Sequence, residues 1–171
     1  MSIELTPYPA DEVDRLEAWV EAPHVRRWWK PPWTGPVITA LRAGVPVPEW
    51  IRPWRIDHQG QPIGYAQDYD VMRDGPVWHG IDGVGPGTRG IDLLIGEAAA
   101  LNRKLGREAI RALTAKVFED ENCDRVVADP HPDHWGAIIA FQKAGWRERG
   151  RHQFPSGPVM ILTAAKSVWK G

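Results

Sequence analysis

Cysteine, net charge and long apolar runs are all scarce in this chain of 171 residues. The single cysteine, Cys123, excludes a disulfide framework and a cysteine-rich metal site, and we expect no metal. The near balance of 21 basic and 22 acidic residues argues against a general nucleic-acid binder. No run approaches the ~18 apolar residues of a membrane span, and the N-terminus lacks the pattern of a secretory signal. We therefore expect a cytoplasmic protein without a membrane partner.

Tryptophan, by contrast, is abundant. Of the ten Trp residues, four lie within a proline-rich window of 23 residues: Trp28, Trp29, Trp33 and Trp50. Aromatic side chains clustered in irregular structure suggest the wall of a binding site, although filling a proline-rich shell is an equally common use. The pattern alone favours neither interpretation.

The chain has the length of one domain, 1–171, and shows no internal repeat. The hydrophobic pattern predicts strands at 3–6, 51–58, 62–72, 90–96, 125–129, 146–154 and 159–164. It predicts helices at 11–22, 38–43, 106–113 and 133–145, with Asp11 and Asp133 as helix caps. This order is typical of an α/β (α+β) fold with a mixed, mostly antiparallel central sheet and helices on both faces.

The central unit is the strand at 90–96 and the helix that follows a basic turn at 102–106. A strand that leads through such a loop into a helix points backbone N–H groups and a positive dipole end at the loop, where phosphate is the simplest ligand. Asp92 lies on the strand just before the loop, so its carboxylate would stand close to that ligand. The alternative for this stretch alone is an ordinary βα unit with a solvated Asp92.

The strand at 62–72 has a polar and aromatic face. Tyr65, Gln67 and Tyr69 alternate along it, so their side chains share one side of the sheet. A face of this kind suits a wall that contacts a ligand.

Five groups of short strings follow one another between roughly residues 50 and 165. They are PIGYAQ at 62–67; RGID at 89–92 with IGE at 95–97; LG at 105–106 with AIRAL at 109–113; DPHPD at 129–133; and AI at 137–138 with KAGW at 143–146. A weaker match is HVRRWW at 24–29. In this order the chain resembles the GCN5-related N-acetyltransferase (GNAT) superfamily. Within it, the chain is most similar to aminoglycoside 6'-N-acetyltransferases and to the acyltransferases of hydroxamate siderophore synthesis.

The resemblance implies acetyl-coenzyme A as co-substrate, with its pyrophosphate in the loop before Gly106 and its pantetheine arm where the fourth and fifth strands part. The residues expected to hold it are Leu94, Ile95, Arg103, Lys104, Leu105, Gly106, Arg107, His134, Phe141 and Lys143. Family members carry glycine at the position of Lys104, where the backbone approaches phosphate closely and can need a positive φ. Lys104 and Arg103 either replace that contact with charge or mark a loop that binds the donor weakly.

Asp92 matches the strand carboxylate that the family uses to position the acceptor amine and to accept its proton. An ammonium must lose that proton before it can attack a thioester. A backbone N–H of the fourth strand would meet the developing oxyanion. Phe141 stands where many members have a Tyr as general acid, so a mechanism that depends on that Tyr is excluded. His134 stands at an Asn position and would either bond the pantetheine arm or act as the acid.

The acceptor implied by the resemblance is a small-molecule amine. Its expected contacts are Trp28, Trp29, Tyr65, Gln67, Tyr69, Asp92 and Asp129, with Asp68, Asp70 and Asp82 as further acids on that side. Several carboxylates around a cleft favour a cationic acceptor, and the resemblance suggests an aminoglycoside. Two alternatives stay open: a siderophore precursor such as hydroxylysine as acceptor, or a GNAT-fold protein that binds without turnover. The resemblance also suggests a homodimer through the C-terminal strands, with Trp169 in its interface.

Overall fold

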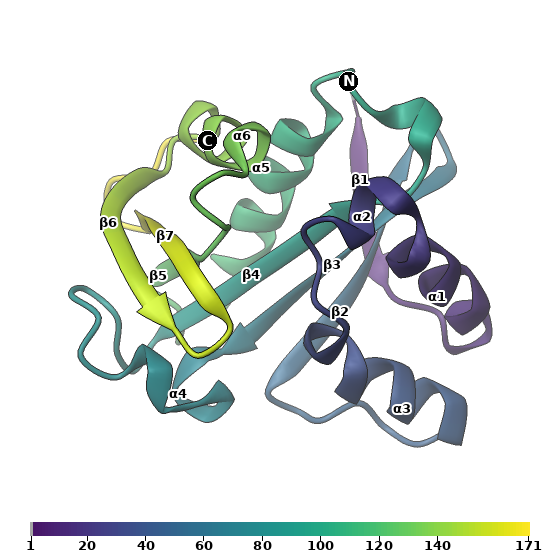
Figure 1. The fold of residues 1–171 in the computed structure, drawn as a ribbon, viewed down its shortest axis with the longest axis horizontal. Helices are drawn as coiled ribbons and strands as arrows, with labels where there is room; N and C mark the ends of the chain where they lie inside the picture. Colours follow the sequence, from purple (N-terminus) through teal and green to yellow (C-terminus); the bar gives the residue numbers. More distant parts are fainter. Residues whose placement is uncertain (1) are drawn as a thin grey trace.

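The computed structural model describes residues 2–171, which build one seven-stranded sheet (Figure 1). The strand order is β1-β2-β3-β4-β5-β7-β6, and every neighbouring pair is antiparallel except β4 with β5. The strands are β1 (Ile3–Pro7), β2 (Ile51–His58), β3 (Gln61–Asp70), β4 (Thr88–Ile95), β5 (Arg125–Ala128), β6 (Arg147–Phe154) and β7 (Gly157–Ala165). The fold class predicted from the sequence is confirmed.

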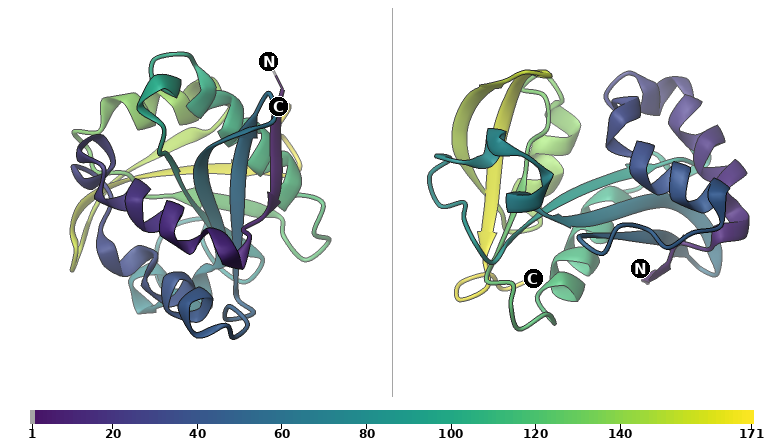
Figure 2. Two further views of the ribbon diagram at one scale, coloured as in Figure 1. Left: turned by 90° about the vertical axis from the view of Figure 1, so that its right-hand side faces the viewer. Right: turned by 90° about the horizontal axis from the view of Figure 1, so that it is seen from below.

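Helices cover both faces of the sheet (Figure 2). One face carries α1 (Val13–Glu21), α2 (Pro23–Arg26), α3 (Gly35–Ala43) and α4 (Val71–Asp74), and the other carries α5 (Leu105–Val117) and α6 (Trp135–Lys143). Four 3-10 turns complete the connections: η1 (Ala10–Glu12), η2 (Pro31–Trp33), η3 (Pro76–Trp78) and η4 (Ala98–Ala100). The described residues contain no helix with the length and apolarity of a bilayer span.

Two apolar cores lie on the two faces because successive strand residues point to opposite sides of a sheet. On β5, Val126 packs in the core under α5 and α6, while its neighbour Val127 packs in the core on the side of α1 and α3. On β7, Leu162 and Ile161 divide in the same way. All four side chains are completely buried, so these strands are covered on both faces.

The sheet opens between its two central parallel strands. β4 and β5 pair only between residues 88–90 and 125–127. Beyond Gly90, β4 continues to Ile95 with β3 as its one strand partner. The edge of β4 that faces α5 and α6 is therefore free of sheet hydrogen bonds, and its backbone groups can serve a ligand.

Some element boundaries differ from the sequence prediction. The segment at 24–33, expected as a turn and a loop, contains the short helix α2 and the turn η2. Helix α3 begins at Gly35 and not at residue 38, because Pro36 sits in the first turn, where its missing N–H costs nothing.

Neither predicted helix cap is present. Asp11 lies inside η1, where no side chain makes a cap bond. The N-cap of α6 is His134, also without a side-chain bond, while the carboxylate of Asp133 lies 3.9 Å from Nδ1 of His131. Asp133 precedes the cap position by one residue, and its backbone N–H donates a 3.0 Å hydrogen bond to Nδ1 of His131.

Candidate active site

Two cavities meet where the sheet opens. The larger cavity, of about 480 Å³, lies between β4, α5, α6 and the α2 segment. The smaller cavity, of about 300 Å³, lies over β3 and β4 beside the turn between β6 and β7. Trp33, Asp92 and Asp129 line both cavities. A ligand in one cavity would therefore meet a ligand in the other beside these two carboxylates.

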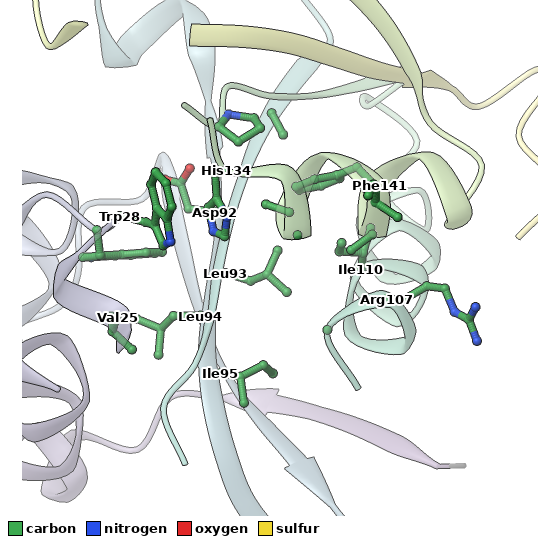
Figure 3. Close-up of a pocket in the computed structure, with 18 of the residues that line it drawn as sticks. Val25, Trp28, Asp92, Leu93, Leu94, Ile95, Arg107, Ile110, His134 and Phe141 are labelled. Atoms are coloured by element: carbon green, nitrogen blue, oxygen red, sulfur yellow. The ribbon is translucent and has the colours of Figure 1, made fainter. Parts of the chain in front are cut away.

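The larger cavity is mainly an apolar channel (Figure 3). Leu93 and Ile95 of β4 lie opposite Ile110 of α5 and Phe141 of α6. Nine of the ten residues predicted to hold the donor line it: Leu94, Ile95, Lys104, Leu105, Gly106, Arg107, His134, Phe141 and Lys143. The tenth, Arg103, is exposed and does not line the channel, whereas Asn102, which was not predicted, does. The channel has the shape and polarity for a long, mostly apolar ligand.

The loop before α5 has a backbone conformation that glycine adopts more easily. Asn102 has φ 60° and Lys104 has φ 62°, a left-handed conformation that costs a residue with a Cβ roughly 1–2 kcal/mol. The two residues with positive φ, Asn102 and Lys104, line the channel, whereas Arg103 between them does not. Lys104 is the N-cap of α5, and no side chain caps this helix. The N–H groups of its first turn, together with the helix dipole, are thus available for an anion.

The smaller cavity is acidic and aromatic. Its carboxylates belong to Asp74, Asp92 and Asp129, and its aromatic walls to Trp33, Trp50, Tyr69, Trp78 and Phe154. None of the residues from 2 to 171 that line it is a Lys, Arg or His. Because no basic side chain of the wall balances the three carboxylates, the cavity favours a ligand that carries several positive charges.

Asp74 is the acid of this group that the sequence reading did not assign. It ends α4 at the mouth of the smaller cavity, and its Oδ2 accepts a hydrogen bond of 2.8 Å from Nε1 of Trp78. Burial raises the pKa of Asp74, and the bond from Trp78 opposes the rise. An Asp and a Trp four residues apart in a loop rich in Gly and Pro are the signal that could have identified it.

The shared carboxylates are poised to exchange protons. Burial raises the pKa of Asp92 to about 7, the hydrogen bond from Gln67 opposes this rise, and the charge of Asp74 adds to it. Burial, followed by the charges of Asp92 and Asp74, also raises the pKa of Asp129. A carboxylate with a pKa near neutrality can both accept and release a proton at neutral pH. Asp92 therefore has the position and the protonation behaviour of a general base.

The rings of Trp28 and His134 stack beside Asp92 (Figure 3), and the guanidinium of Arg27 lies over the ring of Trp28. The rings of Trp28 and His134 are parallel within 6°, with centroids 4.3 Å apart, and Cζ of Arg27 lies 4.8 Å from the centroid of Trp28. Burial, with the charges of Arg27 and His131, lowers the pKa of His134 to about 4. His134 is thus neutral at neutral pH. It can exchange a hydrogen bond with a ligand, but it carries no extra proton for a leaving group.

Of the remaining residues predicted to contact the substrate, three line a cavity and one packs behind the cavity wall. Gln67 and Tyr69 line the smaller cavity, and Trp29 lines the larger one. Tyr65 is completely buried and lines neither. Its ring packs at 82° to that of Trp29, and its hydroxyl donates a 2.8 Å hydrogen bond to Oε1 of Gln67. Tyr65 therefore supports the wall from behind and cannot touch a ligand in either cavity.

Two of the additional acids expected on the acceptor side lie away from both cavities. Asp70 is the N-cap of α4, where its Oδ1 accepts a 3.0 Å hydrogen bond from the backbone N–H of Met72. Asp82 is exposed on the long connection between η3 and β4. Neither can contribute to the charge of the smaller cavity by contact.

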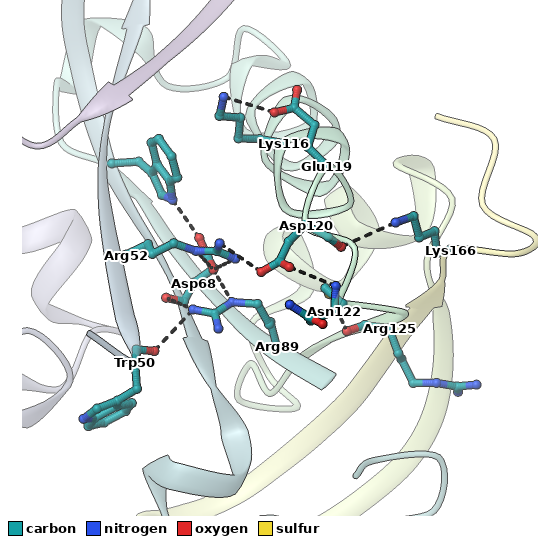
Figure 4. A network of polar contacts seen from close by, with 12 residues as sticks. Trp50, Arg52, Asp68, Arg89, Lys116, Glu119, Asp120, Asn122, Arg125 and Lys166 are labelled. Atoms are coloured by element: carbon teal, nitrogen blue, oxygen red, sulfur yellow. Dashed lines mark hydrogen bonds and ion pairs between the residues drawn. The ribbon is translucent and has the colours of Figure 1, made fainter. Parts of the chain in front are cut away.

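Asp68, the third of these acids, lies on the opposite face of β3 (Figure 4). It is completely buried and accepts hydrogen bonds from Nε of Arg52 at 2.8 Å and from Nε1 of Trp54 at 2.7 Å. Arg89 also donates to its carboxylate, and Arg52 continues to Asp120 at 3.1 Å. Strand alternation explains the placement, because the flanking residues of β3 face the smaller cavity.

The C-terminal Trp169 makes its contacts within the chain. Its ring packs against Phe118 with centroids 5.8 Å apart, and its Nε1 donates a 2.8 Å hydrogen bond to the carbonyl of Ala144. The predicted role of Trp169 in a homodimer interface therefore stays a prediction.

Comparisons with known proteins agree with this geometry. Residues 8–154 match the family model described as an acetyltransferase (GNAT) domain. Aminoglycoside N(6')-acetyltransferase type 1 of Klebsiella pneumoniae is 28% identical over 173 residues, covering 99% of this chain and 86% of that protein. The crystal structure of aminoglycoside acetyltransferase AAC(6')-Ib in complex with coenzyme A superposes with a TM-score of 0.84 at 29% identity, covering 97% of this chain and 96% of the other. The structure of the same enzyme with coenzyme A and kanamycin gives a TM-score of 0.83, with the same identity and coverage.

Proposed function

Because the chain belongs to the GNAT acetyltransferase family, we propose that it transfers the acetyl group of acetyl-coenzyme A to a primary amine of an aminoglycoside-like polycation. The observation that carries this proposal is the junction of an apolar channel and an acidic cavity at Asp92. The channel supplies room for a thioester arm, and the acidic cavity supplies room for a cationic acceptor. Asp92 lies where the two reacting groups would meet.

The chemistry of the smaller cavity favours a polycation over a siderophore precursor. A hydroxylysine-type acceptor carries a carboxylate of its own, and a carboxylate needs a basic partner when it is buried. The described wall of the smaller cavity offers three carboxylates and no basic side chain. An amino sugar fits better, since its ammonium groups can pair with Asp74 and Asp129 while its ring faces Trp50 or Trp78.

The loop before α5 fits the pyrophosphate of the donor. Gly106 and Lys104 line the channel where α5 begins, and the first-turn N–H groups of α5 lie beside them. An amine nucleophile requires an activated acyl carbon, and the bound thioester supplies it. Lys143 also lines the channel and would add positive charge beside the phosphates, whereas Arg107, which lines it too, pairs through its guanidinium with Glu108 at 3.2 Å.

The acceptor ammonium must give up two protons on its way to the amide. Asp92 takes the first, the freed nitrogen attacks the acyl carbon, and the carbon–sulfur bond breaks while the nitrogen loses its second proton to water. The free edge of β4 beyond Gly90 can donate a backbone N–H to the developing oxyanion. Phe141 has no proton to give and His134 is neutral. We therefore propose that the thiolate leaves as such or is protonated by water.

The decisive test is a thiol-release assay with acetyl-coenzyme A and a panel of amines. Kanamycin-like amino sugars should be acetylated at a rate well above that of polyamines and hydroxylysine derivatives, and mass spectrometry should find one added acetyl group. Thermal denaturation gives an independent check, because acetyl-coenzyme A at 100 times its Kd should add about 2.7 kcal/mol of stability. A preference for hydroxylysine would replace the acceptor class. The absence of both turnover and a thermal shift would favour the alternative of a GNAT-fold protein that does not take this donor and binds another ligand without turnover.

A further inference from the structure

The side-chain amide of Gln67 has all of its partners fixed. Its Nε2 donates hydrogen bonds of 3.0 Å to Oδ2 of Asp92 and 3.0 Å to the carbonyl of Trp33. Its Oε1 accepts the 2.8 Å hydrogen bond from the hydroxyl of Tyr65. Gln67 is 4% exposed. The amide therefore links the floor of the smaller cavity to the carboxylate that both cavities share.

These partners allow only one orientation of the amide. A backbone carbonyl can only accept, so the Nε2 side must face Trp33. Burial raises the pKa of Tyr65, so its hydroxyl keeps its proton and donates it to Oε1. A flipped amide would turn its oxygen toward the carbonyl of Trp33 and the carboxylate of Asp92 and lose both of the hydrogen bonds that Nε2 donates. The N–H of Gln67 is thus held toward Asp92 before any substrate binds.

We propose that Gln67 is a positioning residue for the Asp92 carboxylate, holding it at the junction of the two cavities, and that Tyr65 and Trp33 hold Gln67. This inference rests on the proposed function, because it assigns Asp92 the role of base. A donor aimed at one carboxylate oxygen fixes the side-chain torsion of Asp92 and leaves the other oxygen for the acceptor ammonium. It also stabilises the ionised form, which is the form that can take a proton.

No other described group favours the ionised form in the same way. The titratable groups that interact with Asp92 through their charge are Asp74 of α4, Asp129 after β5, and Tyr65 and Tyr69 of β3. None of these four is a cation, and the charge of Asp74 raises the pKa of Asp92. His134 lines the larger cavity with Asp92, but it is neutral at neutral pH because its pKa is lowered to about 4. The bond from Gln67 is the one interaction found to oppose burial at this site.

The test is the pH profile of Gln67→Met, which keeps the length of the side chain and removes both polar ends. The acid-side limb of the kcat profile should move upward by about one pH unit, the effect expected for losing a hydrogen bond to a charged group. Turnover should then fall about fivefold at neutral pH and recover above pH 9. The KM for acetyl-coenzyme A should stay unchanged. Tyr65→Phe should shift the limb in the same direction by a smaller amount.

Gln142→Met provides the matched control. Nε2 of Gln142 also donates to a carboxylate, Oε1 of Glu148 at 2.9 Å, but neither residue lines a cavity. This variant should keep the profile of the parent. If Gln67 merely contacts the acceptor, Gln67→Met will raise the acceptor KM without moving the limb, and the proposal is overturned. If Gln67 only supports the fold, turnover of Gln67→Met will fall equally at every pH, and this result also overturns the proposal.

An NMR titration of the carboxyl carbon of Asp92 separates this inference from the proposed function. In the ligand-free protein, Gln67→Met should raise the pKa of Asp92 whether or not the assay conditions support turnover. An unchanged pKa overturns the inference. A shifted pKa in a protein that acetylates no amine supports the coupling of Gln67 to Asp92 and overturns the proposed function.

Discussion

The two faces of β3 and β4 surround their acids in opposite ways, with Asp68 buried on one face and Asp92 half-buried on the other. On the face of α5, Asp68 is surrounded by Arg52, Arg89 and the indole of Trp54 (Figure 4). On the face of α3 and α4, Asp92 has one neutral hydrogen-bond donor, Gln67, and acids as its charged neighbours. A paired carboxylate is stabilised within the protein, whereas an unpaired one requires a cation from outside.

This difference separates a structural acid from a functional one. The arginines around Asp68 also anchor the strands beside it, since Nη2 of Arg89 donates a 3.2 Å hydrogen bond to the carbonyl of Trp50. Trp50 lines the smaller cavity, so the paired face fixes the wall of the unpaired one. Repulsion among the carboxylates of Asp92, Asp74 and Asp129 lowers the stability of the protein. The packing of the rest of the sheet compensates for this loss.

The largest effect should come from Asp92→Asn. This variant keeps the shape of the side chain and removes the proton acceptor, so turnover should fall about 10²- to 10⁴-fold, the usual contribution of a general base. The Kd of acetyl-coenzyme A should change little, because the loop proposed to hold its phosphates is at the other end of the channel. Steady-state kinetics and a thermal-shift titration measure both quantities. Glu121→Gln, a neutralised acid in an exposed turn, is the control, and turnover equal to that of the parent would remove Asp92 from the mechanism.

Asp68→Ala should have the opposite signature, with loss of stability as its main effect. Removing this buried carboxylate leaves Arg89 without its acidic partner and Arg52 with Asp120 alone, and costs about 3–5 kcal/mol. Urea denaturation measures the loss. Asp14→Ala removes the carboxylate from an exposed pair with Arg42 and should cost less than about 1 kcal/mol. Equal losses for the two variants would contradict the contrast between the paired face and the surface.

The pH dependence of turnover and of stability should also distinguish the face that carries Asp92 from the face that carries Asp68. Because burial raises the pKa of Asp92 to about 7, kcat should fall roughly tenfold per pH unit below that value as the base becomes protonated. The raised pKa also determines the direction in which stability changes with pH. A folded-state pKa above the unfolded one contributes stability at low pH that is lost as the pH rises through the folded value. Asp92→Asn should therefore gain stability relative to the parent from about pH 4, the ordinary pKa of an Asp in the unfolded chain, to about pH 7, the folded value, and a constant difference would argue against the raised pKa.

Sequence reasoning predicted the open edge of the sheet better than it predicted which acids lie on which face of the sheet. The run at 90–96 and the following helix placed Asp92 beside the loop because apolar periodicity determines these elements. The placement of Asp68 with Gln67 and Tyr69 was wrong on physical grounds already available, since neighbouring strand residues cannot share a face. Asp74 was missed because its contact with Trp78 depends on the path of an irregular loop, which no periodic pattern describes.

The smallest effect concerns the other end of the channel, where Lys104 combines charge with a strained backbone. Lys104→Gly should relieve the left-handed conformation at φ 62°, and after the entropy of the unfolded glycine is subtracted, stability should rise by about 0.5–1 kcal/mol. Removal of the ammonium should at the same time weaken acetyl-coenzyme A about fivefold or less, as for an exposed ion pair.

Lys104→Ala separates these two contributions. It removes the charge and keeps the Cβ in the left-handed region, so it should weaken donor binding as Lys104→Gly does without the gain in stability. Isothermal titration with acetyl-coenzyme A and thermal denaturation compare the two variants. Tighter binding by the glycine variant would mean that the lysine obstructs the phosphates. In that case the positive charge at this end of the channel would come from Lys143, and the strain at residue 104 would serve the shape of the loop alone.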